Sequence, residues 1–408
     1  MPKPEKDAIS LAATAHGMGK ERVKPDWPPL TLDEVRAVLR EFPDCGQANE
    51  IVFASPRPFS AACVVATSAG RVFIKRHHRA VRDREGLLEE HSFLAHLRAH
   101  GAPVVRVLAD ASGDTVIEKD EWSYEIHEAF NAADAYEDSL SWTPFRSVAH
   151  AYSAGCALGR LHRASESYDA PSRKPRQLVA SFTIFASNRA DAAMDRYIAA
   201  RPALERYLSK RTDRDDALEL LVPFHEELLP LLSSLNPLWT QNDIHGSNLL
   251  WSDLGADARV AAVIDFGLAD RTNAVHDLAI AIERNIVEWL FLREEPDNDE
   301  SVPVHLDHLY EMLAGYESIR PFSEEEAVAL APMTALCHAE FALSEADYFL
   351  DVLHSEEKAY LATHDYLVGH ARWFRGRMGT MLLDAIDAWA ENRHKPPRLD
   401  RCKEAGVL

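Results

Sequence analysis

The sequence has little cysteine and no cysteine motif. Its five cysteines are scattered along 408 residues, and none forms a C-x-x-C pair. This distribution excludes a disulfide framework and a zinc ribbon, and it is typical of free thiols in a reducing compartment. The opening residues MPKPEKDAIS lack the apolar core of a secretory signal, and no apolar run is expected to span a membrane. We therefore expect a cytoplasmic protein.

Positive charge is also scarce. The chain has 44 Lys and Arg residues against 65 Asp and Glu residues, which gives a formal net charge of −21. A field of this sign disfavours nucleic acid and anionic membrane surfaces as partners. It favours a cationic substrate, or a substrate that arrives with bound metal. The sequence does not predict an oligomeric state.

The order of the predicted elements divides the chain into two lobes, as its length suggests. A charged, proline-rich tail over 1–29 precedes short β-branched runs and one helix over 30–130. Amphipathic helices dominate from 131 to 392, and a second tail follows over 393–408. We therefore expect an α+β protein with a small antiparallel-sheet lobe and a mostly helical lobe.

The first lobe shows clear local signals. Thr31 and Glu34 end a capping box that predicts a short opening helix. The segment 68–70 predicts a hairpin turn, and a helix is expected over 82–100. The expected strands lie within 49–56, 61–68, 71–78, 103–110, 115–120 and 122–130. In the second lobe the expected helices are 144–165, 187–210, 214–234, 274–292, 304–317, 324–353 and 357–391.

A polar stretch interrupts the helices of the second lobe and carries candidate catalytic residues. Asp243 and Asn248 stand within WTQNDIHGSNLLW, and Asp265 ends the apolar run AAVID. If the strands around 250 and 260 pair as a hairpin, Asn248 and Asp265 converge. An amide oxygen with a carboxylate suits Mg²⁺, and a nearby free carboxylate can accept a proton from an alcohol. The alternative for each residue alone is a turn or a strand cap.

Lys75 stands at a buried alternating position of the run RVFIK. A lysine there must bury its stem and find an anion, although many strand lysines simply reach water. Glu89 and Glu90 lie on the following helix. One of them can pair with Lys75 and direct its ammonium toward a phosphate, which a point charge of this kind binds well.

With these residues in place, the sequence resembles the aminoglycoside phosphotransferase and choline kinase family, which has the protein-kinase-like fold. The matching elements, in the family's order and spacing, are Lys75, Glu90, Asp243, Asn248 and the triplet Asp265-Phe266-Gly267. Segments 87–108, 155–165 and 271–284 extend the resemblance, which covers about residues 45–390. The EEHSF run also resembles stress response kinase A, and the opening helix resembles the homoserine kinase branch.

The resemblance implies a role for each matched residue. Asp243 would be the catalytic base that orients the acceptor hydroxyl, and Asn248 and Asp265 would hold Mg²⁺. Lys75 would contact the α- and β-phosphates of ATP, with Glu90 holding its ammonium in place. Further implied roles are adenine contact at Glu128, Ala129 and Phe130, phosphate contact at Ser60, and structural support of the catalytic loop by Asp277.

Two departures from the family pattern stand near these residues. The family usually has His-Gly before the catalytic Asp, whereas this chain has Gln241 and Asn242. Loss of the histidine could loosen the loop or change how Asp243 is held. The segment 55–62, which would cover the phosphates, also contains no glycine, unlike the Gly-rich loop of protein kinases.

The acceptor is expected to be a small molecule. Only twelve residues separate Asp265 from Asp277, which leaves no room for a peptide-binding activation loop. Glu340, Asp347 and Asp351 fall on one helical face. They predict an acidic wall that suits an amine substrate, with a solvated acidic surface as the alternative.

We therefore expect an ATP- and Mg²⁺-dependent enzyme that transfers the γ-phosphate to a hydroxyl of an amino alcohol, a hydroxy amino acid, a sugar or an aminoglycoside-like molecule. A protein Ser/Thr kinase resembling stress response kinase A is one alternative. A nucleotide-binding pseudokinase-like module, suggested by Gln241 and Asn242, is another. A metal-dependent hydrolase is a third, and would draw on Asp243, His245, Asp265, His276 and Asp277.

Overall fold

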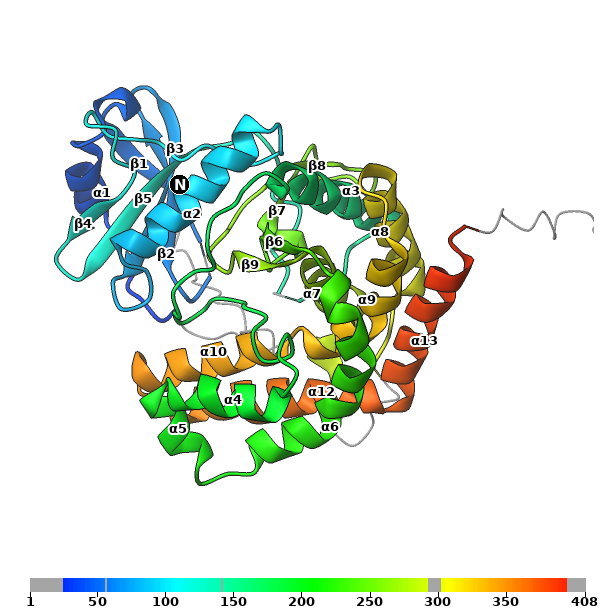
Figure 1. Ribbon diagram of the computed structural model, residues 1–408. Coiled ribbons are helices and arrows are strands. Elements are labelled where there is room, and N and C mark those ends of the chain that lie inside the picture. Colours follow the sequence, from blue (N-terminus) through cyan, green and yellow to red (C-terminus); the bar gives the residue numbers. More distant parts are fainter. Residues whose placement is uncertain (1–24, 56, 141, 293–301, 395–408) are drawn as a thin grey trace, which may run out of the picture.

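The computed structural model describes residues 25–55, 57–140, 142–292 and 302–394. Most of the two predicted tails, 1–29 and 393–408, therefore lies outside the described residues. The rest forms a small lobe with a sheet and a larger helical lobe (Figure 1). The two-lobed α+β arrangement predicted from the sequence is confirmed.

The small lobe is built on an antiparallel sheet of five strands in the order β1-β2-β3-β5-β4. The strands are β1 (Ala48–Ala54), β2 (Ala61–Thr67), β3 (Gly70–His78), β4 (Ile117–Lys119) and β5 (Trp122–Glu128). The expected hairpin turn joins β2 to β3, where Thr67 pairs with Gly70. The run at 103–110 is not a strand, contrary to prediction, because Val104 and Val107 make only isolated bridges.

Two helices contact opposite faces of this sheet. The helix α1 (Leu32–Leu39) begins at the expected Thr31 capping box and packs against the apolar side chains of the strands. The helix α2 (Arg84–Ala99) lies on the other face, toward the helical lobe (Figure 1). Since successive strand residues point to opposite faces, Ile74 joins the core beneath α1 while Lys75 points toward α2 and the other lobe.

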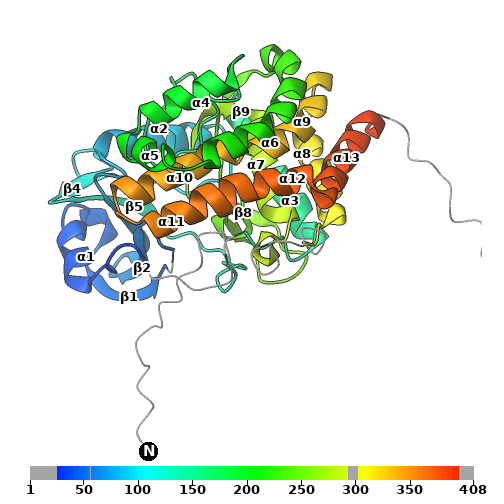
Figure 2. The ribbon, with the colours of Figure 1, turned by 90° about the horizontal axis from the view of Figure 1, so that it is seen from below.

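The larger lobe surrounds a single large core, which also takes in side chains of α2. Figure 1 shows its helices below and to the right of the small lobe, and Figure 2 shows them from a second side. Its main helices are α3 (Val148–Ser165), α4 (Ala190–Ala199), α5 (Pro202–Leu208), α6 (Asp213–Leu228), α7 (Ala274–Ile286), α8 (Leu306–Ile319), α9 (Glu324–Leu336), α10 (Ala339–Asp351), α11 (Glu356–Tyr360), α12 (Gly369–Arg375) and α13 (Arg377–Asn392).

Several of the predicted helices were too long. The one predicted over 274–292 ends at Ile286, because Val287 is extended, and the one over 214–234 is α-helical only to Leu228. The one predicted over 187–210 is broken before Pro202, since proline cannot donate the helical hydrogen bond and instead begins α5. The one over 324–353 turns between α9 and α10. The one over 357–391 becomes a π-helix at Leu361–Val368 and breaks at Gly376, whose backbone is extended.

The helices α3 and α8 cross at very short range. A Cβ added to Gly155 would lie 2.0 Å from the carbonyl oxygen of Met312, and one added to Gly315 would lie 2.1 Å from that of Tyr152. Glycine at both positions therefore allows the two backbones to touch. This crossing anchors α3, whose last turn carries His162 into the site described below.

One segment, Glu324–Asp351, is long and apolar enough to span a membrane, which the sequence was not expected to contain. It comprises α9 and α10, and 94% of its most apolar window is buried inside the protein. Packing in the core of the helical lobe accounts for its composition.

Candidate active site

Two short sheets position the polar stretch of the helical lobe. Strand β7 (Leu249–Trp251) pairs with β8 (Val260–Val263), as predicted, and β6 (Pro237–Thr240) pairs with β9 (Asp270–Asn273), which was not predicted. Asn248 directly precedes β7, and its carbonyl accepts a hydrogen bond of 3.0 Å from Ile264 N–H. The neighbouring Asp265 is therefore held at the same end of the hairpin as Asn248.

Asp243 is joined directly to Asn248. The Asn248 side-chain Nδ2 donates to the backbone carbonyl of Asp243 at 3.0 Å and to its Oδ2 at 2.8 Å. On its other oxygen, Oδ1, Asp243 forms an ion pair with Nη1 of Arg284, a residue of α7. The carboxylate is mostly buried but keeps 12% of its side-chain surface exposed. It is thus held from two sides.

Lys75 crosses from the small lobe to Asp265. Its Nζ lies 2.9 Å from Oδ1 of Asp265, and the two side chains are 11% and 36% exposed. Burial would lower the pKa of Lys75, but the carboxylates of Asp265, Glu125 and Glu90 raise it above its usual value. Burial would raise the pKa of Asp265, but Lys75 holds it below its usual value. Both groups are therefore charged at neutral pH.

The predicted ion pair between Lys75 and Glu90 is not formed among the described residues. Glu90 is buried, and its Oε2 lies 4.0 Å from Nη2 of Arg173 and has no hydrogen-bond partner within the described part of the chain. The prediction was wrong because Asp265 is the nearer carboxylate, while the segment around Arg173, which the sequence did not place, reaches α2. Glu90 still acts on Lys75 through space, as its effect on the lysine pKa indicates.

Two buried arginines fasten the Asp-Phe-Gly segment to the small lobe. Arg173 donates from Nη1 to the carbonyls of Gly267 and Ala269, both at 3.1 Å, and from Nη2 to that of Gly86 on α2. Arg82 also donates to the Gly267 carbonyl, and burial lowers its pKa to about 10. Sequence reasoning missed both residues, since an isolated arginine gives no signal of its partners.

Gln241 joins the loop that carries Asp243 to the segment that carries Asp265. Its Nε2 donates to the Asp265 carbonyl at 2.6 Å, and its Oε1 accepts the backbone N–H of Asp243 at 2.6 Å. Asn242 follows with a φ of 60°, a left-handed conformation that glycine and asparagine tolerate best. These contacts answer the doubt raised by the absence of His-Gly. Gln241 makes the loop-to-loop bonds, and Asn242 accepts the conformation that suits glycine.

Asp277 holds the same loop from α7. Its Oδ2 accepts the N–H of Gln241 at 3.0 Å, and its Oδ1 accepts that of Asn242 at 2.8 Å. His162, at the end of α3, lies 3.0 Å from Oδ2 through Nε2. A fully buried carboxylate is thus satisfied by two backbone amides and a histidine, as a buried charge requires.

A second buried carboxylate, that of Glu125, acts on Lys75 from the neighbouring strand β5. Glu125 is opposite Lys75 in the β3–β5 register. Its oxygens lie 2.8–2.9 Å from Nε2 of three histidines, His77, His91 and His127. Burial would raise the pKa of Glu125, but Coulomb attraction to His127 and the hydrogen bonds with the three histidines keep it well below its usual value. Its negative charge helps to hold the lysine ammonium in place.

Lys75, Asp243, Asn248 and Asp265 line one cavity of about 120 Å³ between the lobes. From the small lobe it is lined by the segment 57–60 and by Lys75, His77, Val81 and Arg82. From the helical lobe it is lined by Trp142, Leu178, Asp243, His245, Asn248, Asp265, Gly267, Leu268, Arg284, Phe341 and Glu345. The cavity therefore brings together the predicted base, both predicted metal ligands, Lys75 and Ser60.

The predicted hinge residues, Glu128, Ala129 and Phe130, lie at the end of β5 and do not line this cavity. The N–H of Glu128 donates to the Arg106 carbonyl at 2.9 Å, and its carboxylate accepts from the Arg106 N–H at 2.9 Å. The Glu128 amide is thus already used within the protein. Ala129 and Phe130 form the connection into the helical lobe.

The predicted acidic wall is not part of the cavity. Glu340 accepts the N–H groups of Thr183 and Ile184 and so holds a turn. Asp347 and Asp351 both accept from the side chain of Gln177, at 3.2 and 3.1 Å. The prediction failed because these carboxylates have partners that are remote in the sequence. Glu345 of the same helix lines the cavity instead.

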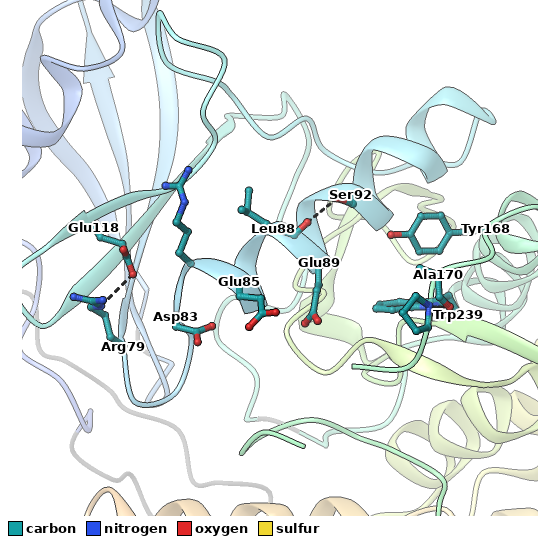
Figure 3. A pocket seen from close by; sticks show the side chains of 12 residues that line it. Arg79, Asp83, Glu85, Leu88, Glu89, Ser92, Glu118, Tyr168, Ala170 and Trp239 are labelled. Atoms are coloured by element: carbon teal, nitrogen blue, oxygen red, sulfur yellow. Dashed lines mark hydrogen bonds and ion pairs between the residues drawn. The ribbon is translucent and has the colours of Figure 1, made fainter. Parts of the chain in front are cut away.

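A larger hollow of about 700 Å³ lies beside α2 (Figure 3), and Lys75, Asp243, Asn248 and Asp265 are not among its lining residues. Figure 3 shows Glu85 and Glu89 of α2 on one side of it and Tyr168 and Trp239 on the other. Its acidic groups are engaged with arginines, as in the Arg79–Glu118 ion pair of 3.1 Å. The smaller cavity is the candidate active site, because Lys75, Asp243 and Asp265 line it.

The metal cluster of a hydrolase is not assembled. Among the described residues, the two groups with metal-like spacing are His91–Glu125–His127 and His305–Asp307–His308. Neither contains the five residues considered for that alternative. His276 instead contacts the ring of Phe182. Asp277 accepts the backbone N–H groups of Gln241 and Asn242.

The model of the phosphotransferase enzyme family (APH) matches residues 58–322, which is more than half of the chain. The chain belongs to this family. The match includes Lys75, Asp243, Asn248 and Asp265, and it begins within the segment that carries Ser60.

Solved structures agree with the fold of this phosphotransferase. A microcompartment-associated aminopropanol kinase is 16% identical with a TM-score of 0.54, and the alignment covers 84% of this chain and 95% of that one. The aminoglycoside phosphotransferase APH(4)-Ia is 15% identical with a TM-score of 0.52, over 85% of this chain and 100% of that one. A search among curated proteins gave no match. At such low identity the structures support the fold, and the reaction must be argued from the site.

Proposed function

We propose that this phosphotransferase uses ATP and Mg²⁺ to phosphorylate a hydroxyl group of a small molecule. One observation carries the proposal. The Lys75–Asp265 ion pair and the Asn248–Asp243 hydrogen bonds meet in one cavity between the lobes. A cation for phosphate, two oxygen ligands for a metal and a carboxylate for the hydroxyl are what phosphoryl transfer requires.

The donor set fits Mg²⁺. Nδ2 of Asn248 is bonded to Asp243, so its amide oxygen is the atom that can ligate a cation. Asp265 is held ionised by Lys75 and keeps 36% of its side chain exposed toward the cavity. One amide and one carboxylate oxygen, with waters and phosphates completing the shell, is a usual magnesium environment. When bound, the ion would neutralise charge on the phosphates.

In the proposed reaction the acceptor oxygen forms a bond to the γ-phosphorus. The bond from that phosphorus to the β,γ-bridging oxygen breaks, and ADP leaves with the electron pair. The hydroxyl proton passes to the Asp243 carboxylate and then to solvent. Lys75 neutralises phosphate oxygens, and Asn248 and Arg284 keep the carboxylate oriented toward the hydroxyl.

The remaining contacts proposed for the nucleotide come from residues of the small lobe. Ser60 lines the cavity from the segment that follows β1 and would contact phosphate oxygens. Ala129 and Phe130, at the end of β5, would meet the adenine. Glu90 would act on Lys75 through its charge, since the two do not form an ion pair.

A small acceptor is favoured over a protein. The thirteen residues from Asp265 through Asp277 include the Asp-Phe-Gly segment, β9 and the start of α7. Arg173 and Arg82 fix this segment to the small lobe, so no loop is left to bind a peptide. The scarcity of cysteine motifs agrees with a reaction in the cytoplasm, where ATP is available.

The experiment is phosphate transfer from [γ-³²P]ATP to a panel of hydroxyl compounds, with a peptide library in parallel. We expect Mg²⁺-dependent labelling of a small molecule. Thermal stabilisation by ATP should require Mg²⁺ in the parent protein and lose that requirement in Asp265→Asn, but not in the exposed-site control Asp257→Asn. Labelling of peptides alone would establish the protein-kinase alternative. ATP binding without transfer to any acceptor would establish the binding module.

A further inference from the structure

Arg284 is a buried cation with an unused edge. It is 2% exposed and lines the cavity from α7. The guanidinium is paired with Asp243 through Nη1 and also makes a side-chain hydrogen bond with Tyr366, whereas Nε and Nη2 are without a close hydrogen-bond partner among the described residues. The adjacent Glu283 does not neutralise it, because that carboxylate bonds Nδ1 of His370 at 2.7 Å. Leaving two buried donors unpaired is costly unless a ligand engages them.

The unused atoms have the geometry of a carboxylate receptor. Nε and Nη2 lie on one edge of the planar guanidinium and present two parallel N–H bonds, which match the two oxygens of a carboxylate. Trp142 and Phe341 stand beside the group, with ring centroids 5.4 and 5.1 Å from its central carbon. These apolar walls strengthen any interaction with an anion by excluding water.

Glu345 supplies the opposite charge. It is 2% exposed and lines the same cavity from α10, and its Oε2 has no partner among the described residues. No ion pair joins it to Arg284 within that part of the chain. Burial raises the pKa of its carboxyl to about 8, although Arg284 acts in the opposite direction. An ammonium group brought into the cavity would restore its charge.

The two charges point to one kind of acceptor. Arg284 and Glu345 line the same cavity, and a molecule that carries both a carboxylate and an ammonium would match both of them.

We propose that the acceptor is a short hydroxy amino acid, bound through its carboxylate to the Nε–Nη2 edge of Arg284 and through its ammonium to Glu345. Because Nη1 of the same arginine holds Asp243, this pose brings the hydroxyl of a short side chain to the base. The inference rests on the proposed function and names the substrate class of that site. It replaces the acidic wall at Glu340, Asp347 and Asp351.

The test compares three sets of acceptors that differ by one group. L-Serine, L-threonine and L-homoserine carry both charges, ethanolamine and 3-aminopropanol lack the carboxylate, and 3-hydroxypropionate and 4-hydroxybutyrate lack the ammonium. Steady-state phosphorylation with Mg²⁺ and ATP gives kcat and KM for each. We expect at least one hydroxy amino acid to exceed the matched compounds in kcat/KM by about 10–100-fold, the usual value of a charge-assisted contact.

Variants assign that preference to residues. Arg284→Lys keeps the positive charge but removes the paired Nε and Nη2 donors. It should raise KM for the amino acid about 10–100-fold and change KM for the amino alcohol less than threefold. Glu345→Gln should also raise KM for the amino acid about 10–100-fold, while KM for the hydroxy acid, which has no ammonium, should change less than threefold. The exposed residues Arg160 and Glu357 supply the matched controls Arg160→Lys and Glu357→Gln. Melting temperature and KM for ATP monitor folding, and Glu345→Gln carries the test if Arg284→Lys does not fold.

Three outcomes would overturn the inference. Amino alcohols, sugars or aminoglycosides could be the best acceptors, which would leave the proposed function standing. Arg284→Lys could raise KM equally for the hydroxy amino acids and the amino alcohols, which would show that the Nε–Nη2 edge does not bind the acceptor carboxylate. Transfer could fail with every hydroxyl although Mg²⁺ and ATP bind, and then the proposed function itself is wrong.

Discussion

Replacing Gln241 by alanine tests how the base and the metal-ligand segment are held together. The residue is 1% exposed and joins the Asp243 N–H to the Asp265 carbonyl through two hydrogen bonds of 2.6 Å each. Its removal leaves one donor and one acceptor without their partner. Each unsatisfied buried group costs about 1–3 kcal/mol. Some water can enter from the adjacent cavity, so we expect a loss of about 2–4 kcal/mol in unfolding free energy.

The same change should affect turnover more than binding. For a chain of this size, that loss corresponds to a fall of about 2–5 °C in melting temperature. A shift of about 1 Å at the Asp243 carboxylate can reduce rate by about 10²-fold. We therefore expect Gln241→Ala to lower kcat by about 10–100-fold on the best acceptor, with KM for ATP changed less than threefold.

A matched variant separates position from general damage. Gln177→Ala removes a part-buried amide that bonds Asp347 and Asp351 outside the cavity, and should keep kcat within twofold. If Gln241→Ala also kept kcat within twofold, the catalytic loop would be held without this bridge, and the account of the Gln241–Asn242 departure would be wrong.

Three further predictions follow from the same contacts. Asp243→Asn should fold and bind ATP with Mg²⁺ but lose about 10²–10⁴-fold in kcat in the transfer assay, and normal turnover would exclude Asp243 as the base. Gly155→Ala should lower the unfolding free energy by about 1–3 kcal/mol, because its Cβ meets the Met312 carbonyl at 2.0 Å, whereas Gly369→Ala, with its nearest contact at 3.5 Å, should be neutral by thermal melting. The folded-state pKa of Glu345, about 8, lies above its usual 4.5, so its contribution to stability is complete below pH 4.5 and is lost as the pH rises to 8. Between pH 6 and 9 the melting temperature should therefore fall less in Glu345→Gln than in the parent. Equal slopes for the two proteins would contradict the burial of a neutral carboxyl.

The sequence predicted the parts of the site that depend on local order. The β7–β8 hairpin could be predicted because β-branched and apolar runs flank a polar turn, and its closure brings Asn248 beside Asp265. Lys75 was found because alternation along β3 places it on the face opposite the buried Ile74. Such signals arise from neighbours within a few residues of each other.

The partners that cross the molecule could not be predicted in this way. Arg173 reaches Gly86 and Gly267, and Arg284 reaches Asp243, over separations that no periodicity encodes. Glu340 was predicted to contact the substrate because its helical face is acidic. Its carboxylate instead accepts hydrogen bonds from the backbone N–H groups of Thr183 and Ile184. In both cases the outcome depends on tertiary packing, which brings together groups whose types are common everywhere on the chain.

The central claim is that Asn248 and Asp265 together hold the divalent ion of the nucleotide beside Asp243. Anomalous diffraction from a crystal of the protein with Mn²⁺ and AMP-PNP measures the position of that ion directly. The account predicts a peak between the Asn248 amide oxygen and the Asp265 carboxylate. A peak at His91, Glu125 and His127 instead, with none at the cavity, would contradict it.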